Sequence, residues 1–385
     1  MLRTTISTLL LATALGVAPL AAQPAFAQEV FETAELPIQV EHFAEGLSHP
    51  WGIAFLPEGG MLVTERSGNI RLVSDDGAVS SPIAGVPPVV ARGQGGLLDI
   101  TLDPQFSENR LVYWSYSEAG ENGTNGTAIA RGQLAGDMSG LTDVEVIFRQ
   151  QPKVQSNAHF GSRLVFDNDG YLFATLGERS SARYRVLAQD LGTHLGKVIR
   201  INADGSVPDD NPFVGQADAM PEIWSYGHRN PQGMALHPST GAIWTHEHGP
   251  RGGDEVTIPQ AGANYGWPVF SYGREYSGDP ITDLDSYPAE FAEPIHQWTP
   301  SIAPSGMAFY DGDGISEWQG DLFIGALAAT SLHRLTLDGD RVTGEETLLE
   351  SMGLRIRDVA TGPDGALYVL TDESDGAILR ITAAD

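Results

Sequence analysis

The stretch GMALHPSTGAIWTHEHG, residues 233–249, contains the pattern on which the fold depends. Apolar and polar residues alternate on both sides of a Pro-Ser-Thr-Gly turn. Such alternation is typical of two antiparallel β-strands joined by a tight connection. The second strand ends in a run of polar residues, so the stretch predicts a β-hairpin that carries chemically active side chains at one end.

The same pattern recurs five more times, at intervals of roughly 50 to 70 residues. The other copies are GIAFLPEGGMLVTER (52–66), LLDITLDPQFSENRLVYWSYS (97–117), SRLVFDNDGYLFATLGE (162–178), GMAFYDGDGISEWQGDLFIGAL (306–327) and DVATGPDGALYVLTDES (358–374). A hairpin repeated six times predicts a six-bladed β-propeller, because each small antiparallel sheet of a propeller buries its faces against its neighbours.

Further strand-like segments follow several copies and would form the outer strands of the blades: 69–73, 197–202, 331–337 and 377–382. A pair of β-sandwiches also contains many short strands, but it does not require the same hairpin six times. Long helical periodicity is absent after residue 27. We therefore predict an all-β fold in which residues 28–385 form one six-bladed domain.

The first 27 residues predict a secretory signal peptide. Arg3 precedes an apolar run over 9–20, and the segment ends in the small-residue sequence Ala25-Phe26-Ala27. No later stretch is apolar for the roughly 18 residues of a membrane-spanning helix. We therefore expect a periplasmic protein without a membrane span, and its 0 Cys leave stability to core burial and bound ions.

The chain is strongly acidic, with 50 Asp and Glu against 22 Lys and Arg and a net charge of −28. This charge disfavours nucleic acid and anionic membranes as partners. It favours solubility, and it also supplies oxygen ligands for a hard cation such as Ca²⁺. We expect a monomer or a weak dimer.

Polar residues lie in comparable places around the hairpins. They are Gln94 before the second copy, His159 before the third and Glu178 after it, Arg229, Asn230 and Gln232 before the fourth and 249–255 after it, and Arg355 and Arg357 before the sixth and Asp372 after it. The start of the first strand and the end of the second meet at the same end of a hairpin. We therefore expect these residues to converge on one mouth of the central channel.

His159 offers a proton acceptor, because a neutral imidazole is basic near neutral pH. A nearby carboxylate such as Glu178 would fix its tautomer. The alternative is a structural histidine that donates to a loop carbonyl.

Four arginines offer planar forks that suit carboxylates and developing oxyanions: Arg229, Arg251, Arg355 and Arg357. The alternation in LRIRDV places Arg355 and Arg357 on one face of a strand, which indicates a polyanionic ligand. Pairing with the abundant acids is the alternative.

The sequence His246-Glu247-His248 invites a zinc site, but adjacent strand residues point to opposite faces and the helical HExxH arrangement is missing. Oxygen ligation of Ca²⁺ fits better, through carbonyls and one carboxylate from Gly249, Pro250, Glu255 and Tyr265. The acidic 311–314 segment lacks most calcium-loop positions and indicates a hairpin turn. No dinucleotide, ATP or serine-hydrolase motif stands in a suitable context.

Seven segments together resemble the soluble quinoprotein aldose sugar dehydrogenases of the glucose/sorbosone dehydrogenase group. They are LSHPWGIAFLPEG, RGQGGLLDI, AHFGSRLVFDNDGYLFATLGE, LGKVIRINADGSVPDDNPF, SYGHRNPQGMALHP, HEHGPRGGDEV with NYGWP, and RDVATGPDGALYVLTD, and they span nearly the whole chain in order. The resemblance implies a six-bladed propeller that uses pyrroloquinoline quinone (PQQ) and Ca²⁺. It implies oxidation of aldoses at the anomeric carbon to lactones, with hydride transfer to PQQ.

The resemblance also implies roles for individual residues. His159 matches the general base, with Glu178 as its partner, and Arg229 matches the residue that meets the reducible quinone oxygen. The residues implied to hold the quinone are Gln94, Asn230, Gln232, Arg355, Arg357 and Asp372. Gly249 and Pro250 match carbonyl ligands of the cofactor's Ca²⁺, and Glu255 and Tyr265 match ligands of a second, structural Ca²⁺.

Two positions depart from the family pattern. Glu178 stands where some members have Asp, and Ala328 stands where the glucose-oxidising branch has a Lys that faces a cofactor carboxylate. The only lysines are Lys153 and Lys197, and Lys197 lies in a strand-like segment that suggests a structural role. PQQ would then depend on arginine for its carboxylates.

The leading hypothesis is a periplasmic PQQ-dependent aldose dehydrogenase with an unidentified electron acceptor. A non-catalytic propeller that binds sugars or proteins is one alternative, because this fold does not dictate function. A propeller lactonase that uses Ca²⁺ to activate water is another.

Overall fold

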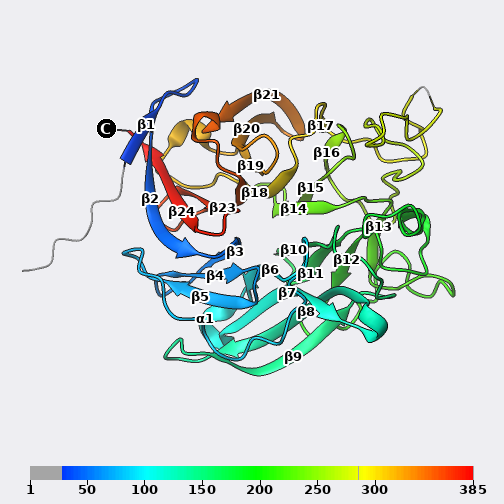
Figure 1. The fold of residues 1–385 in the computed structure, drawn as a ribbon, viewed down its shortest axis with the longest axis horizontal. Helices are drawn as coiled ribbons and strands as arrows, with labels where there is room; N and C mark the ends of the chain where they lie inside the picture. Colours follow the sequence, from blue (N-terminus) through cyan, green and yellow to red (C-terminus); the bar gives the residue numbers. More distant parts are fainter. Residues whose placement is uncertain (1–27, 285, 385) are drawn as a thin grey trace, which may run out of the picture.

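The computed structural model describes residues 28–284 and 286–384, which form six antiparallel sheets around a central axis (Figure 1). One sheet has five strands, four have four and one has three. The predicted all-β, six-bladed β-propeller is confirmed. The predicted signal peptide, residues 1–27, lies outside the described residues. Within these ranges no helix is long and apolar enough to cross a membrane.

The first three blades follow one another along the chain. Blade 1 consists of β3 (Pro50–Phe55), β4 (Met61–Glu65) and β5 (Asn69–Val73). Blade 2 consists of β6 (Leu97–Leu102), β7 (Leu111–Ala119), β8 (Asn125–Leu134) and β9 (Leu141–Arg149). Blade 3 consists of β10 (Gly161–Phe166), β11 (Leu172–Leu176), β12 (Lys197–Ile201) and β13 (Ile223–Tyr226).

The second half of the ring has the same plan. Blade 4 consists of β14 (Pro231–Leu236), β15 (Ile243–Glu247), β16 (Asp254–Thr257) and β17 (His296–Trp298). Blade 5 consists of β18 (Pro304–Phe309), β19 (Leu322–Ala326), β20 (Ser331–Asp338) and β21 (Arg341–Leu348). Blade 6 consists of β22 (Ile356–Thr361), β23 (Leu367–Thr371), β24 (Gly376–Ala383), β2 (Ile38–Leu47) and β1 (Gln28–Phe31). The helices are single turns: α1 (Phe106–Asn109), η1 (Glu121–Gly123), η2 (Arg185–Gln189), η3 (Ser316–Trp318) and η4 (Glu350–Met352).

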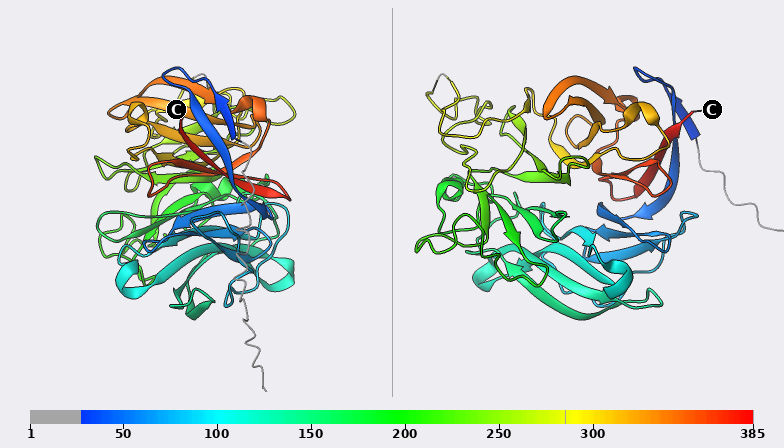
Figure 2. Two further views of the ribbon diagram at one scale, coloured as in Figure 1. Left: turned by 90° about the vertical axis from the view of Figure 1, so that its left-hand side faces the viewer. Right: turned by 180° about the vertical axis from the view of Figure 1, so that it is seen from behind.

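The two ends of the described chain close the ring within blade 6. Strand β2 pairs antiparallel with β24, from Ile38 opposite Ala383 to Leu47 opposite Gly376. Figure 2 shows β1 and β2 beside the C-terminal strand in both further views. This pairing joins the first and last strands of the chain in one sheet and so closes the ring. The repeats predicted β24 but gave no indication of β1 and β2.

The apolar core lies between adjacent blades. Six buried clusters each combine residues of two neighbouring sheets. In one of them, Leu62 of blade 1 packs with Trp114 of blade 2, and both are fully buried. Alternation along each strand sends one set of side chains to each neighbour, which explains why the hairpin pattern must repeat around the ring.

The third residues of the six inner strands meet around the channel: Gly52, Asp99, Arg163, Gly233, Gly306 and Asp358. Arg163 Nη1 lies 2.8 Å from Asp99 Oδ1 and 2.9 Å from Asp358 Oδ1. Arg163 and Asp358 belong to opposite blades, so this ion pair crosses the channel. A Cβ atom on Gly306 would lie 2.0 Å from Asp358 Oδ1, and only glycine leaves this room.

Every inner strand begins at the same face of the ring. The residues that begin these strands lie opposite the ends of the second strands, as in Gly161 opposite Leu176 and Pro231 opposite Glu247. We call this end the candidate-site face. The hairpin turns, such as the one between Phe166 and Leu172, lie at the opposite face.

Candidate active site

His159 and Glu178 flank one blade-3 hairpin at the candidate-site face. His159 Nδ1 lies 2.9 Å from Glu178 Oε1, and the two residues are 5% and 1% exposed. The His159 backbone N–H donates to Gln94 Oε1 at 2.7 Å, which ties the histidine to the loop before blade 2. The structure therefore brings together three residues that the sequence placed separately.

The carboxylate of Glu178 determines which ring nitrogen of His159 is available. A carboxylate accepts a hydrogen bond, so the neutral imidazole carries its proton on Nδ1 and leaves the Nε2 lone pair free. Burial lowers the pKa of His159 and the nearby charge of Arg229 lowers it further, whereas the hydrogen bond to Glu178 raises it. The imidazole is consequently neutral at neutral pH and ready to accept a proton.

Glu247, the last residue of β15, organises the segment that contains Arg229. Glu247 Oε2 accepts hydrogen bonds from the backbone N–H groups of Arg229 and Asn230, and Oε1 lies 3.1 Å from His228 Nδ1. A buried carboxylate thus satisfies the backbone donors of a tight turn. The register of β14 and β15, which pairs Pro231 with Glu247, places this acid beneath the turn.

The Arg229 guanidinium lies 6% exposed at the mouth. Its Nη1 donates to the carbonyls of His248 and Gly249 at 2.9 and 2.8 Å, and its Nε is buried without a partner. The guanidinium also stands 5.3 Å from the ring centroid of Trp267. The Nε–H and one Nη2 hydrogen of this fork therefore have no acceptor among the described residues.

Asn230 and Gln232 connect blade 4 to its neighbours. Asn230 Oδ1 accepts from the Gly161 N–H at 3.1 Å, two residues beyond His159, while its buried Nδ2 has no partner. Gln232 Oε1 accepts from Arg357 Nη1 at 2.9 Å. The candidate residues of blades 3, 4 and 6 therefore form one connected group.

A cluster of positive charge lies at the blade-6 side of the mouth. Asp372 Oδ2 is 2.8 Å from Arg357 Nη2 and 3.3 Å from Arg355 Nη2, and Arg66 lies 3.7 Å from the other carboxylate oxygen. Burial works to raise the pKa of Asp372, but Arg357, Arg66 and Arg355 outweigh it and hold the pKa below its usual range. Three guanidinium groups around one carboxylate leave positive charge for an anionic ligand.

The predicted calcium ligands fall in two places. Glu255 and Tyr265 line a cavity of about 10 Å³, which is the size of one water molecule or ion. No described residue donates a hydrogen bond to the Glu255 carboxylate, and burial, Glu247 and Asp254 raise its pKa well above the usual value. A buried carboxylate beside an ion-sized space fits a hard cation.

The second predicted cation position, at Gly249 and Pro250, is more constrained. The Gly249 carbonyl already accepts from Arg229 and offers its remaining lone pair only. No hydrogen bond from the described chain reaches the Pro250 carbonyl. Among the residues in the described ranges, no three His, Asp or Glu side chains are grouped to hold a metal, so carbonyl ligands would be needed here.

A cavity of about 770 Å³ opens beside this loop. Its lining includes Gly249, Pro250, Arg251 and Ala328, and this volume is typical of small-molecule sites. Ala328, the position where the glucose-oxidising branch has a Lys, therefore lines this cavity. Lys197 is fully buried and donates to three backbone carbonyls, so its expected structural role is confirmed.

Several residues at the mouth had no role assigned from the sequence. Glu247 and Asp254 lie within the polar stretch after the fourth hairpin, where the density of acids was a usable signal. Asp254 accepts from the Gly249, Ile302 and Ala303 N–H groups and so joins the loops of blades 4 and 5. Tyr276, whose hydroxyl lies 3.5 Å from Arg229 Nη2, belongs to a loop without a recognisable pattern.

Comparison with known proteins gives consistent matches. A sequence model of the Glucose / Sorbosone dehydrogenase family matches residues 47–380. Aldose sugar dehydrogenase YliI of Escherichia coli (strain K12) is 49% identical over 347 residues, which cover 90% of this chain and 93% of that protein. The crystal structure of the soluble aldose sugar dehydrogenase from Escherichia coli in the apo-form superposes with a TM-score of 0.87 at 48% identity, over 90% of this chain and 100% of the other. The PQQ-bound aldose sugar dehydrogenase of Streptomyces coelicolor has a TM-score of 0.73 and 28% identity, over 94% and 100%.

Proposed function

The chain belongs to the glucose/sorbosone dehydrogenase family, and we propose that it oxidises aldose sugars at the anomeric carbon to lactones with PQQ as its redox cofactor. The observation that carries this proposal is the buried His159–Glu178 pair, which lies beside Arg229 at a single mouth of the propeller. A binding module has no need for a neutral, oriented imidazole next to a guanidinium with a free donor.

His159 acts as the general base in this proposal. Its Nε2 atom takes the proton of the anomeric hydroxyl, and the resulting imidazolium is stabilised by Glu178 through Nδ1. When bound, PQQ supplies a quinone that accepts the hydride of the same carbon. The aldose thus loses one proton and one hydride and becomes the lactone.

Arg229 and the blade-6 arginines hold the cofactor in this proposal. The free Nε of Arg229 is suited to an oxygen that gains negative charge. Arg355 and Arg357 are suited to carboxylates, and Asp372 keeps both forks aligned. Gln94, Asn230 and Gln232 border the same space, and the unpartnered Nδ2 of Asn230 supplies a further donor.

Two calcium ions complete the proposed site. Glu255 and the Tyr265 carbonyl would hold a structural Ca²⁺ in the ion-sized cavity, and the Gly249 and Pro250 carbonyls would hold one at the cofactor. A cation at Gly249 would add to the positive charge that Arg229 presents.

The cellular setting is proposed from the sequence. The signal-peptide pattern of residues 1–27 supports export to the periplasm, where an unidentified acceptor would reoxidise the cofactor. We propose a monomer or a weak dimer, formed from the single propeller of residues 28–385.

The test is reconstitution of the cofactor-free protein with PQQ and Ca²⁺, followed by an assay of dye reduction with a panel of aldoses. We expect dye reduction that depends on both additions and on the sugar. Absence of turnover with every aldose would reject the proposed reaction. Lactone hydrolysis by the Ca²⁺-loaded protein without PQQ would favour the hydrolase alternative.

A further inference from the structure

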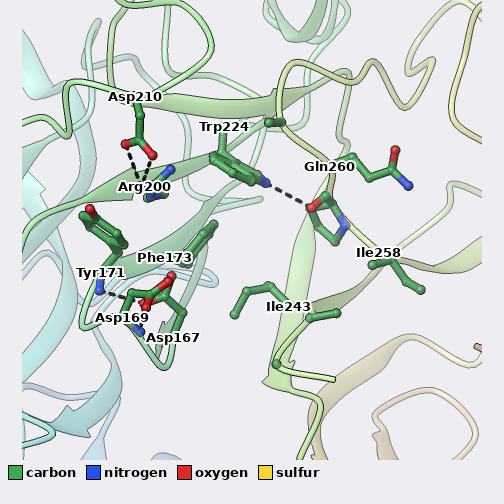
Figure 3. A pocket seen from close by; sticks show the side chains of 14 residues that line it. Asp167, Asp169, Tyr171, Phe173, Arg200, Asp210, Trp224, Ile243, Ile258 and Gln260 are labelled. Carbon is green, nitrogen blue, oxygen red and sulfur yellow. Dashed lines mark hydrogen bonds and ion pairs between the residues drawn. The ribbon is translucent and has the colours of Figure 1, made fainter. Parts of the chain in front are cut away.

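A second large cavity lies away from the candidate active site. Its volume is about 810 Å³, and it lies between blades 3 and 4 (Figure 3). It is bordered by the 167–171 turn, by Gly241 in the turn between β14 and β15, and by residues 258–261 after β16. These turns belong to the face opposite the mouth, and no candidate catalytic, cofactor or metal residue lines the cavity.

The floor of this cavity is apolar and rigid. Figure 3 shows Phe173 and Trp224 on one side and Ile243 and Ile258 on the other. Phe173 meets Trp224 edge to face at 5.4 Å, and the indole N–H of Trp224 donates to the Pro259 carbonyl at 3.0 Å. These contacts fix the orientation of the indole, so a ligand would not have to order it.

Arg200 forms the buried polar wall. Its side chain stacks 3.9 Å from the Tyr171 ring centroid and 5.0 Å from that of Trp224, and Nη2 binds both oxygens of Asp210 at 2.8 and 3.0 Å. Arg200 is 5% exposed, and its Nε is buried without a hydrogen-bond partner. The ion pair with Asp210 and the two aromatic rings hold the guanidinium in place, so Arg200 is a fixed part of the wall.

The rim of the cavity carries carboxylates, which accept hydrogen bonds, and one amide, which both donates and accepts. Asp167 Oδ1 accepts from the N–H groups of Asp169 and Tyr171 and holds the turn in place. No described residue donates to the carboxylate of Asp169. Gln260 lies on the other side of the opening, exposed, with an amide that can donate and accept.

The charges of the lining argue against an anionic ligand, because Asp210 neutralises Arg200 and leaves Asp167 and Asp169 to repel an anion. The aromatic faces that an organic cation would seek on Tyr171 and Trp224 lie against the guanidinium of Arg200. The carboxylates, the amide of Gln260 and the apolar floor together suit a ligand that combines hydroxyl groups with apolar C–H surface.

We propose that this cavity is a second carbohydrate site, which binds a neutral saccharide without reacting with it. The C–H surface of a sugar ring would pack on the apolar floor of the cavity, on Ile243, Ile258 and the part of Trp224 that Arg200 leaves uncovered. The hydroxyls would donate to Asp169 and accept from Gln260. This binding is independent of PQQ and of the reaction proposed at the mouth.

The test uses the cofactor-free full protein and measures binding of neutral mono-, di- and trisaccharides by saturation-transfer NMR and calorimetry. Tetramethylammonium and inorganic phosphate serve as cationic and anionic probes. Asp169→Ala combined with Gln260→Ala removes two exposed rim partners, and Ala261→Trp places a bulky ring at the opening. Asp340→Ala, in the exposed turn between β20 and β21, is the control for a lost surface charge.

We expect at least one saccharide to bind, about tenfold more weakly to the double variant, as the loss of two hydrogen bonds implies. Binding should vanish in Ala261→Trp and persist in Asp340→Ala and in His159→Ala. Dye-reduction activity should be unchanged in Ala261→Trp, so the site can be tested whether or not the proposed reaction is correct.

Three results would overturn this assignment. The first is that no saccharide binds, and the second is that saccharide binding survives in Ala261→Trp. The third is that tetramethylammonium or phosphate, and no sugar, is displaced by the Ala261→Trp ring.

Discussion

Two buried groups of acids in this propeller differ in what neutralises them. At the channel centre, Asp99 and Asp358 share Arg163 Nη1 at 2.8 and 2.9 Å. In blade 4, no cation of the described residues lies within ion-pair distance of Glu255, and burial, Glu247 and Asp254 raise its pKa. The first group carries its own cation, and the second does not.

This difference separates structural from functional charge. Burial raises the pKa of Asp99 to about 7, although Arg163 and the Leu164 N–H lower it. The arginine and the N–H donor therefore stabilise the charged form of the buried acid. The central group joins opposite blades across the channel. Glu255 instead requires a cation from solution, because an uncompensated buried carboxylate is costly. A buried charge without a partner in the chain therefore indicates a ligand site.

The largest expected effect concerns chemistry at the mouth, where His159 has a carboxylate partner but a free Nε2. His159→Ala should lower turnover by about 10² to 10⁴, the usual loss of a general base, while PQQ binding persists. The control is His42→Ala, which removes a partly exposed histidine that lies 3.0 Å from Glu45. Near-normal turnover in the His159 variant would remove it from the mechanism.

The next effect tests the central group. Arg163→Met should lower the free energy of unfolding by about 3–5 kcal/mol, because it leaves two buried carboxylates without their cation. Arg341→Ala, which breaks an exposed pair with Asp338, should cost about 0–1 kcal/mol. Denaturant unfolding measures both. Equal costs would show that the central ion pair does not stabilise the ring.

The third prediction concerns Glu255, the buried acid for which the described chain supplies no cation. Saturating Ca²⁺ should stabilise the wild type by about 2.7 kcal/mol at a hundredfold excess over Kd, and Glu255→Gln should abolish most of this gain. Thermal unfolding with Ca²⁺ or chelator is the measurement. Asp313→Asn, in the acidic turn that we expect to bind nothing, is the control. A calcium gain that survives in Glu255→Gln would contradict the site.

The fourth prediction concerns the cofactor pocket, where Ala328 stands at the position of the family's Lys. Ala328→Lys should tighten PQQ binding by up to about 1.5–3 kcal/mol if a charge-assisted hydrogen bond forms, less the cost of desolvating the ammonium. Wild-type affinity should be modest and salt-sensitive. Ala34→Lys, at an exposed position, controls for net charge. Equal affinities of wild type and Ala328→Lys at low salt would mean that Ala328 does not face the quinone or that another residue fills the role.

The smallest effect concerns the partner of the base. Glu178 raises the pKa of His159, so Glu178→Gln should lower it and shift the acidic limb of the turnover profile to lower pH. Turnover at neutral pH should also fall, because an amide stabilises the imidazolium less than a carboxylate does. The pH profile of turnover measures both. An unchanged profile would show that Glu178 does not act on His159.

The sequence predicted the parts that depend on local pattern. The six hairpins follow from alternation around turns, and the approach of Glu178 to His159 follows from their places around one hairpin. The closure of β2 on β24 could not be predicted, because it joins segments more than 300 residues apart without a distinctive pattern. The pairing of Arg163 with Asp358 was missed for the same reason, since each reads alone as a charged residue in an apolar strand.

The central claim is that the mouth of this propeller binds PQQ. The most direct measurement is a visible-absorption titration of the cofactor-free protein with PQQ in the presence of Ca²⁺. The account predicts saturable uptake that ends at one PQQ per chain. A spectrum that equals the sum of free PQQ and protein at every ratio would contradict it.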